Sequence, residues 1–296
     1  MPRATHTGSA WISTSILTLF MAMSLVAPSP AGAHVTSAAG SDACGTKIRK
    51  ALLGTWSCTF IDSFSGTSVN TAKWNTQDTA ISGFFLGRTC FKSGQNSRVA
   101  NGTLRLTVTK TATPFVCKSP YGEFETQYLG ADINTWGKFN QTYGRFEARL
   151  KFPGYTQAGY HGGWWMNPQD HVYGAWPLSG EIDVAEWWSS TPDRAYPSLH
   201  YLGSTINDTG FNCTIGAADT FHTYTLEWTP LDMKFLYDGK VCFTRLLTPT
   251  LLVPSLPFDQ RFGLTLTFGE GSPVAPSTAT TPFPATMVVD YVKVWR

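Results

Sequence analysis

Three carboxylates lie within six residues of one short apolar segment. They are Glu181, Asp183 and Glu186, and the residues between them are Ile, Val and Ala. In an extended strand side chains alternate between faces, so Glu181 and Asp183 should point the same way and Glu186 the opposite way. One extra residue, a β-bulge at Val184 or Ala185, would return Glu186 to the shared face. Bulges occur often beside active sites.

Carboxylates gathered in this way suit the cleavage of a glycosidic bond by double displacement. One carboxylate must be ionised to attack the anomeric carbon, while another must hold a proton for the leaving oxygen. The retaining reaction needs these two groups about 5–5.5 Å apart, a separation that long Glu side chains reach by leaning inward on a bent strand. Asp183 between them makes it costly to ionise all three acids, so we expect one proton to stay in the cluster.

The alternative interpretation of the three acids is an ion cluster or a Ca²⁺ site. Ca²⁺ usually also takes Asn, Gly or other carbonyl-rich loop ligands. The Ile, Val, Ala and Trp neighbours of the motif do not offer them. The sequence therefore favours catalysis over metal binding at this segment.

The composition favours short strands and turns. The chain has 296 residues, of which 14% are charged and 14% aromatic, with 11 Trp, 27 Gly and 18 Pro. An average soluble protein has about 25% charged residues, so long solvated helices are not expected, whereas aromatics with frequent Gly and Pro suit strands. The net charge of +2 is too small for a surface that follows phosphates, so we expect no nucleic-acid partner.

The N-terminus has the pattern of an export signal. Arg3 supplies a positive start, residues 11–26 are mostly apolar, and Ala-Gly-Ala at 31–33 is a small-residue cleavage site. A retained membrane anchor is the weaker alternative, because the apolar run is shorter than the roughly 20 residues that a spanning helix needs. We expect residues 1–33 to be removed and the mature protein to be secreted, with no membrane partner.

The cysteines are expected to form disulfides in an exported protein. Their number is even, their spacing is wide, and no C-x-x-C pair suggests zinc or a redox site. Pairing each cysteine with its sequence neighbour is the simplest of the fifteen possible connectivities. The six are Cys44, Cys58, Cys90, Cys117, Cys213 and Cys242.

Turn signals recur along the chain and no segment resembles a linker between domains. Asn-Gly at 101–102 and Asp-Gly at 238–239, each between alternating segments, predict hairpins. A short helix is expected around residues 47–53. We predict an N-terminal extension at 34–55 and one catalytic domain, an antiparallel sandwich, at 56–296.

The motif Gly-Glu-Ile-Asp-Val-Ala-Glu at 180–186 resembles the signature of glycoside hydrolase family 16, in the E-x-D-x-x-E form of bacterial laminarinases and β-glucanases. Further segments match the family in the right order over nearly all of the mature chain. These segments are 143–149, 176–177, 221–224, 227–229, 237–239, 257–260 and 289–294.

The resemblance implies an all-β fold, a concanavalin-like β-jelly-roll sandwich of two antiparallel sheets with a substrate cleft on its concave face. It also implies endo-acting, retaining hydrolysis of β-1,3 or mixed β-1,3/1,4 glucan. By motif position Glu181 is the nucleophile, Asp183 its assistant and Glu186 the acid/base. The chemistry requires no cofactor, and we expect a monomer whose partner is the β-glucan substrate.

The resemblance also suggests residues that bind sugar. Trp165 and Trp176 match positions that stack on sugar rings, where a flat indole covers apolar C–H groups. His200 matches a histidine near the acid/base, and Asn96 a polar contact in the glycone subsites. Trp187 is a further candidate. Core packing is the alternative for Trp165 and Trp187, and a buried, hydrogen-bonded structural role is the alternative for His200.

The family resemblance further implies a structural Ca²⁺ on the convex face. Asp290 would be its side-chain ligand, together with carbonyl groups near Ser63 and Gly102. An ordinary strand aspartate is the alternative interpretation of Asp290.

The sequence departs from the family pattern at two cleft positions. His161 stands where a tryptophan is usual four residues before Trp165, and Thr267 stands where an asparagine is usual. These departures affect the expected substrate more than the expected chemistry. A galactan hydrolase or a transglycosylase on the same scaffold is therefore the rival enzyme. A lectin-like carbohydrate-binding module is the rival outside enzymes, although the three intact acids argue against it.

Overall fold

The computed structural model describes residues 40–51, 53–247 and 257–296. The predicted signal peptide, residues 1–33, lies outside the described residues, as does the start of the predicted extension. No helix in the described ranges combines the length and apolar character needed to cross a membrane.

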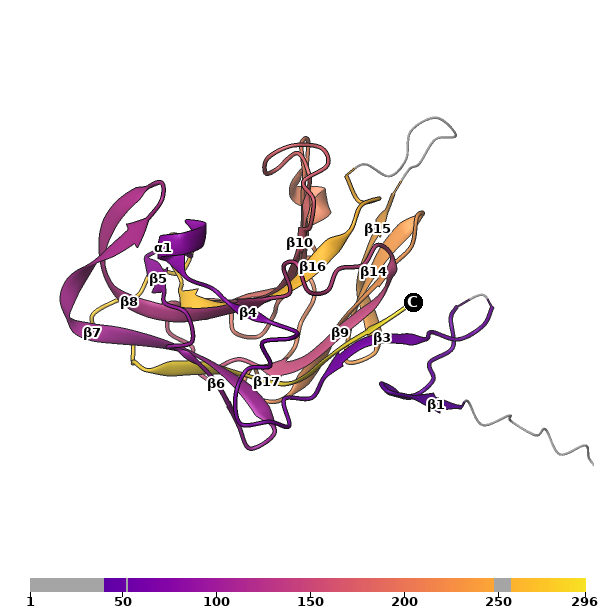
Figure 1. The fold of residues 1–296 in the computed structure, drawn as a ribbon, viewed down its shortest axis with the longest axis horizontal. Helices are drawn as coiled ribbons and strands as arrows, with labels where there is room; N and C mark the ends of the chain where they lie inside the picture. Colours follow the sequence, from indigo (N-terminus) through magenta and orange to yellow (C-terminus); the bar gives the residue numbers. More distant parts are fainter. Residues whose placement is uncertain (1–39, 52, 248–256) are drawn as a thin grey trace, which may run out of the picture. The chain divides into compact units, whose positions relative to one another are not determined.

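The described residues form strands joined by turns, with one short α-helix, α1 (Thr79–Ser82), and one 3-10 turn, η1 (Ile206–Asp208) (Figure 1). The strands are β1 (Ser41–Asp42), β2 (Gly45–Thr46), β3 (Cys58–Asp62), β4 (Asn75–Thr76), β5 (Thr89–Phe91), β6 (Ser97–Ala100), β7 (Thr103–Ser119), β8 (Gly122–Asn134), β9 (Gly144–Lys151), β10 (Tyr160–Pro168), β11 (Glu181–Trp188), β12 (Tyr196–His200), β13 (His222–Trp228), β14 (Asp232–Tyr237), β15 (Lys240–Leu246), β16 (Phe262–Glu270) and β17 (Ala285–Trp295).

The strands form two antiparallel layers that are joined into one hydrogen-bonded path. Neighbours on the path follow the order β12-β11-β10-β16-β8-β7-β17-β9-β13-β14-β15. The long strand β7 pairs with β17 near its start and with β8 further along, so it links the two layers. In Figure 1, β8 and β16 run above β17 and β9. The predicted all-β antiparallel sandwich is confirmed, and its two sheets are continuous through β7 and β8.

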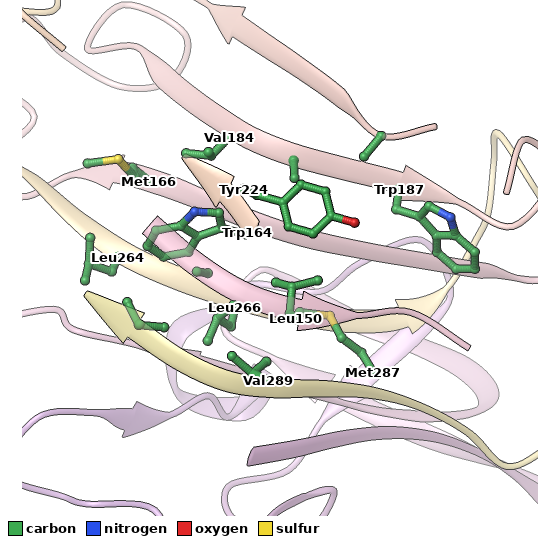
Figure 2. Close-up of a cluster of buried hydrophobic side chains, with 14 of the residues drawn as sticks. Leu150, Trp164, Met166, Val184, Trp187, Tyr224, Leu264, Leu266, Met287 and Val289 are labelled. Carbon is green, nitrogen blue, oxygen red and sulfur yellow. The ribbon is translucent and has the colours of Figure 1, made fainter. Parts of the chain in front are cut away.

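One large apolar core fills the space between the layers. Alternation along β7 places Leu104, Leu106 and Val108 on its buried face, as a half-buried strand requires. From the opposite layer, the Trp187 ring stacks on Phe152 with centroids 4.7 Å apart and planes at 7°. Figure 2 shows side chains of both layers in this core, labelled Leu150, Trp164, Met166, Val184, Trp187, Tyr224, Leu264, Leu266, Met287 and Val289.

Both predicted hairpins are present. Residues 101–102 turn the chain from β6 into β7, and residues 238–239 turn it from β14 into β15. The prediction of a short helix around residues 47–53 is wrong. Gly54 turns the chain at a φ of 82°, which brings Arg49 opposite Thr55 in an isolated bridge.

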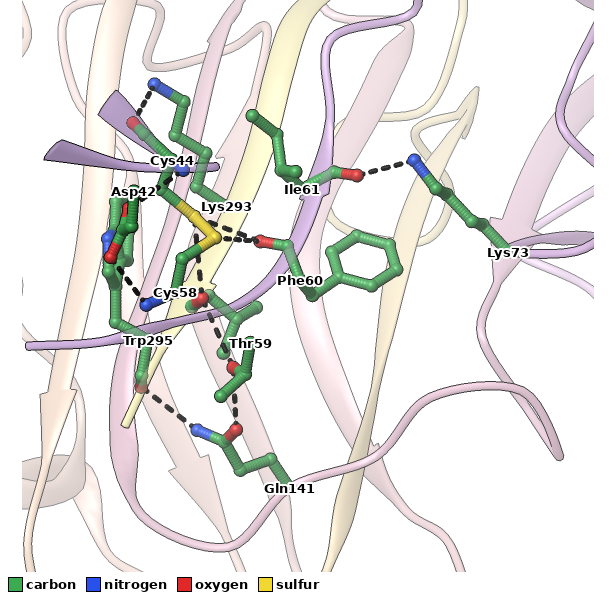
Figure 3. The surroundings of a disulfide bond; sticks show 11 residues. Asp42, Cys44, Cys58, Thr59, Phe60, Ile61, Lys73, Gln141, Lys293 and Trp295 are labelled. Carbon is green, nitrogen blue, oxygen red and sulfur yellow. Dashed lines mark hydrogen bonds between the residues drawn. A yellow bond between two sulfur atoms is a disulfide. The ribbon is translucent and has the colours of Figure 1, made fainter.

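The three disulfides have the predicted neighbour-to-neighbour pairing, Cys44–Cys58, Cys90–Cys117 and Cys213–Cys242. The first ties the described part of the N-terminal extension to the sandwich (Figure 3). Asp42 reinforces this link, because its carboxylate accepts hydrogen bonds from the backbone N–H groups of Cys44 and Cys58 at 2.9 and 3.0 Å. Lys293 on β17 donates to the Cys44 carbonyl at 2.9 Å.

The full burial of Trp187 leads to a stability prediction. We expect Trp187→Ala to lower the free energy of unfolding by about 3–5 kcal/mol, because a cavity replaces a large ring in a close-packed core. Trp136→Ala is the matched control, since Trp136 is 47% exposed and surface changes usually stay within about 0.5 kcal/mol. Urea unfolding measures both. Equal losses in the two variants would contradict this placement of Trp187.

Candidate active site

Strand β11 contains the bulge that the carboxylate spacing predicted. Asp183 pairs with Ser198 on β12, whereas Glu186 pairs with Tyr196, so three steps along β11 match two steps along β12. The register with β10 on the other side shifts at the same point. The extra residue therefore lies at 184–185.

The bulge sorts the side chains of β11 onto two faces. Ile182, Val184 and Trp187 are completely buried in the core. Glu181 and Glu186 are partly exposed, and they lie on the opposite face. A regular strand would have buried Glu186 beside Val184, which would leave a carboxylate in an apolar core at high cost.

Two of the acids each contact a histidine from a neighbouring strand. His200 Nε2 on β12 lies 3.0 Å from Asp183 Oδ2, and His161 Nε2 on β10 lies 2.9 Å from Glu186 Oε1. Ligand atoms of Glu181, Asp183 and His200 all lie within 4.8 Å of one another. The acids are therefore gathered on one face, as the sequence predicted.

The surroundings shift the pKa values of the two glutamates in opposite directions. Burial, followed by the charge of Asp183, raises the pKa of Glu181 to about 8, although His200 and a hydrogen bond from Trp176 act against it. Burial also raises the pKa of Glu186, but the hydrogen bond and charge of His161 outweigh it and leave this pKa below the ordinary value. Of the two glutamates, Glu181 is therefore the weaker acid in the sugar-free site, whereas the roles expected from the motif place the proton on Glu186.

His200 is the cationic member of the site. The hydrogen bond to Asp183 raises its pKa to about 9; burial opposes this rise, and the charges of Asp183, Glu181 and Glu186 add to it. His200 therefore carries a proton at neutral pH and partly balances the negative charge of the cluster. The side chain of His200 is 40% exposed, so the buried structural alternative does not describe it, and a sugar contact by His200 stays a prediction.

A cleft of about 730 Å³ crosses β8, β10 and β16 beside the acids. Trp165 lies on its wall and is paired in register with Asp183, so this wall of the cleft is next to the acids in the sheet. Its lining is rich in amide, carboxylate and aromatic groups, as a sugar site requires. They include Asn75, Gln77, Asp132, Asn134, Trp136, Trp165 and Asn167.

The indoles of Trp165 and Trp176 both reach the open face. Trp165 is half-buried, and its Nε1 donates to Thr267 Oγ1 at 2.9 Å, which fixes the ring in the cleft wall. Thr267 in turn donates to the buried carboxyl group of Asp132. Trp176 is 61% exposed, and its ring centroid lies 6.4 Å from that of His200.

The family description "Glycosyl hydrolases family 16" matches residues 87–291, which include the bulged strand and the cleft floor. The chain belongs to this family. It is similar to a glucan endo-1,3-beta-glucosidase A1 of Niallia circulans, with 30% identity over 261 residues, which are 79% of this chain and 37% of that protein. The chain thus spans little more than a third of that relative.

Two further family 16 comparisons cover more of the other protein. A beta-glucanase of Rhodothermus marinus is 33% identical over 215 residues, which are 68% of this chain and 71% of that protein. The crystal structure of a laminarinase from Flavobacterium sp. UMI-01 has a TM-score of 0.68 and 27% identity, and covers 81% of this chain and 100% of that one. This likeness confirms the predicted jelly-roll fold.

The assignment of Trp187 as a sugar contact is wrong. Its side chain has no exposed surface, and its Nε1 donates to the Pro192 carbonyl at 3.3 Å. The reason is the strand itself, since a bulge that brings Glu186 to the open face turns the next residue inward and the following one, Trp188, outward.

Asn96 contributes to the framework of this family 16 domain. Its amide nitrogen donates to the Thr107 carbonyl at 2.8 Å, to Thr109 Oγ1 at 3.2 Å and to the Leu129 carbonyl at 3.2 Å. It therefore joins β7 to β8. A sugar contact by Asn96 would have to use its carbonyl oxygen, and it stays a prediction.

The surroundings of Asp290 do not fit the Ca²⁺ site that the resemblance implied. Asp290 Oδ2 accepts from Arg149 Nη1 at 2.5 Å, so a guanidinium already contacts the oxygen that a cation would take. The ordinary strand aspartate is the interpretation that this contact supports.

The contacts of His161, Trp188 and the Thr267–Asp132 pair were not predicted. The sequence singled out His161 and Thr267 only as departures from the family pattern, which is the signal that could have found them. The hydroxyl of Thr267 holds Asp132, whose pKa burial raises to about 7 despite hydrogen bonds from Thr267 and Asn134. A carboxyl group with a raised pKa thus lines the cleft.

The histidine and the raised acid predict how stability depends on pH. The pKa of His200 rises from 6.5 to about 9 in the folded protein, so its contribution is complete below pH 6.5 and is lost as pH rises through about 9. The pKa of Glu181 rises from 4.5 to about 8, so its contribution to stability is lost as pH rises from 4.5 to about 8. We expect the melting temperature to fall from pH 6.5 to 9, and to fall less in His200→Gln. An unchanged slope in this variant, measured by calorimetry, would contradict the assignment.

Proposed function

We propose that this family 16 protein is an endo-acting, retaining hydrolase of β-1,3 or mixed β-1,3/1,4 glucan, with Glu181 as nucleophile, Glu186 as acid/base and Asp183 as the residue that orients Glu181. The observation that carries the proposal is the bulged strand, which presents the three acids on one face beside an aromatic cleft. The names of the two sequence relatives, a glucan endo-1,3-beta-glucosidase and a beta-glucanase, support β-glucan as the substrate.

The first half-reaction forms a glycosyl ester. A carboxylate oxygen of Glu181 attacks the anomeric carbon, and the bond from that carbon to the glycosidic oxygen breaks. The departing oxygen takes the proton of Glu186, so the leaving sugar is released as an alcohol.

The second half-reaction returns the enzyme to its starting state. Water attacks the anomeric carbon and gives a proton to the Glu186 carboxylate, while the ester bond to Glu181 breaks. Two inversions leave the β-configuration of the product unchanged. The chemistry uses carboxyl groups alone, so we propose that no cofactor takes part.

Substrate binding must move the proton of the cluster. In the sugar-free site the proton favours Glu181, because burial and Asp183 raise the pKa of that group. A glycosidic oxygen near Glu186 accepts a hydrogen bond from the protonated acid, and positive charge that develops on the anomeric carbon favours an ionised Glu181. Both effects transfer the proton to Glu186 as the bond begins to break.

The cleft offers stacking surfaces for several sugar units. Trp165 and Trp136 line it, and Trp176 lies beside His200 at the acids. Indole faces bury the apolar C–H surface of pyranose rings. A surface of this kind beside the acids suits an internal stretch of polysaccharide, which favours endo action.

We also propose that the protein is exported as a monomer, with residues 1–33 as the signal peptide. The pairing of all six cysteines supports an oxidising compartment. A galactan hydrolase and a transglycosylase on this fold are the alternatives, because His161 and Thr267 depart from the family pattern where they contact Glu186 and Trp165.

Replacing either glutamate tests the assignment of roles. We expect Glu181→Gln and Glu186→Gln each to lower kcat/KM by at least about 10³-fold, because each removes a group that reacts with the substrate. Asp183→Asn should cost less, since it only orients and charges its neighbour. With azide and an activated aryl glycoside, Glu186→Ala should give the β-azide and Glu181→Ala the α-azide. The opposite products would exchange the two roles.

A substrate panel tests the proposed specificity. We expect release of reducing ends from laminarin and lichenan with an early fall in viscosity, as internal cleavage requires, and little release from agarose. Glu181→Gln is the control for contaminating activity. Preferential release from agarose would favour the galactan hydrolase, and binding of laminarin without release from any polymer would favour the lectin-like module.

A further inference from the structure

His161 lies against the carboxyl group of Glu186 in a fixed orientation. Its Nε2 is 2.9 Å from Glu186 Oε1, and its side chain is only 11% exposed. The ring stacks on Trp188, with centroids 3.6 Å apart and planes at 11°. Because one face of the imidazole is covered and its edge contacts the acid, the ring has little freedom to turn away.

The register between β10 and β11 produces this contact. Gly163 pairs with Glu186, and His161 pairs with Trp188. His161 and Gly163 are two residues apart and so share a face, and diagonal neighbours on a sheet face are within reach of long side chains. Gly163 carries no side chain, which leaves the diagonal from Glu186 to His161 clear.

The surroundings of Nδ1 indicate which ring nitrogen of His161 donates the hydrogen bond. His161 Nδ1 is buried and has no hydrogen-bond partner among the described residues. A proton there would bury an N–H group without an acceptor, which proteins rarely tolerate. A hydrogen on Nε2 has the Glu186 carboxyl group as its acceptor, so Nε2 is the nitrogen that donates. Nε2 then donates to Glu186, and an ionised carboxylate is the better acceptor.

The other titratable groups near Glu186 do not replace this donor. They are Glu181 and Asp183 of β11, His200 of β12 and Tyr237 of β14. The two acids oppose a charge on Glu186, and His200 is paired with Asp183 at 3.0 Å. The Tyr237 hydroxyl donates to the Val184 carbonyl at 3.0 Å. Of these groups, His161 is the one at hydrogen-bond distance from the Glu186 carboxylate.

We propose that His161 is a positioning residue that donates a hydrogen bond from Nε2 to Glu186, keeps that carboxyl group ionised in the sugar-free site and aims it for the removal of a proton from water. The inference rests on the proposed role of Glu186 as the acid/base. A donor at Glu186 opposes the first half-reaction, which needs the protonated acid, and favours the second, which needs the carboxylate. His161 therefore affects the relative rates of the two half-reactions and the pH below which activity falls.

The ionisation of Glu186 is measured directly by ¹³C NMR titration of protein labelled at the glutamate carboxyl carbon, with its signal assigned by loss in Glu186→Gln. His161→Phe keeps a ring to stack on Trp188 but has no donor. In this variant we expect the titration midpoint of Glu186 to rise by about one pH unit. The acidic limb of the kcat/KM profile should shift to higher pH by the same amount. The kcat on a dinitrophenyl glycoside, which is limited by the second half-reaction, should fall about tenfold. His161→Gln, whose amide donates, should restore most of both.

His222→Phe is the matched control, since His222 pairs with Asp238 at 2.7 Å in the other layer and its loss should leave the Glu186 midpoint unchanged. If His161→Phe does not fold, His161→Ala carries the same expectation. An unmoved Glu186 midpoint in a folded variant without the donor overturns the proposal. Normal hydrolysis by Glu186→Gln would instead remove the proposed role of Glu186, while the titration would still decide whether His161 controls its ionisation.

Discussion

The proposed active site depends on one extra residue in the pleat of β11. Without it, the strand cannot place Glu181 and Glu186 on one face, because they are five positions apart. The buried face needs the extra residue too. Val184 and Trp187 are three positions apart and would point to opposite faces in a regular strand, yet both are fully buried. One defect therefore satisfies the core and the cleft together. Removing it would push either a carboxylate into the core or an indole into the solvent.

Gathering three acids on one face creates an electrostatic cost, which the neighbouring strands reduce. His200 supplies a positive charge from β12, and His161 supplies a hydrogen-bond donor from β10. The two histidines differ in effect because His200 contacts Asp183 and His161 contacts Glu186. Burial keeps the pKa of Glu181 raised in spite of His200, whereas the contact with His161 leaves the pKa of Glu186 below its ordinary value.

The sequence predicted the features that depend on local pattern. The hairpin turns at 101–102 and 238–239, the neighbouring disulfide pairs and the bulge could all be inferred from spacing and residue type. The burial of Trp187 is a consequence of the same bulge, because a residue beside an outward Glu186 must point inward. The contact of His161 with Glu186 could not be inferred in this way. It joins residues 25 positions apart, and it exists only in one register of β10 against β11.

The opposite layer also takes part in building the site. A bulge leaves its extra residue outside the regular ladder of hydrogen bonds, and a buried carbonyl without a donor is costly. Tyr237, on β14 of the other layer, donates its hydroxyl to the Val184 carbonyl at 3.0 Å. The defect that aims the acids is thus stabilised by a residue that cannot reach the cleft. Sandwich packing and catalytic geometry are therefore linked through this one hydroxyl group, and the core of the protein helps to define its active site.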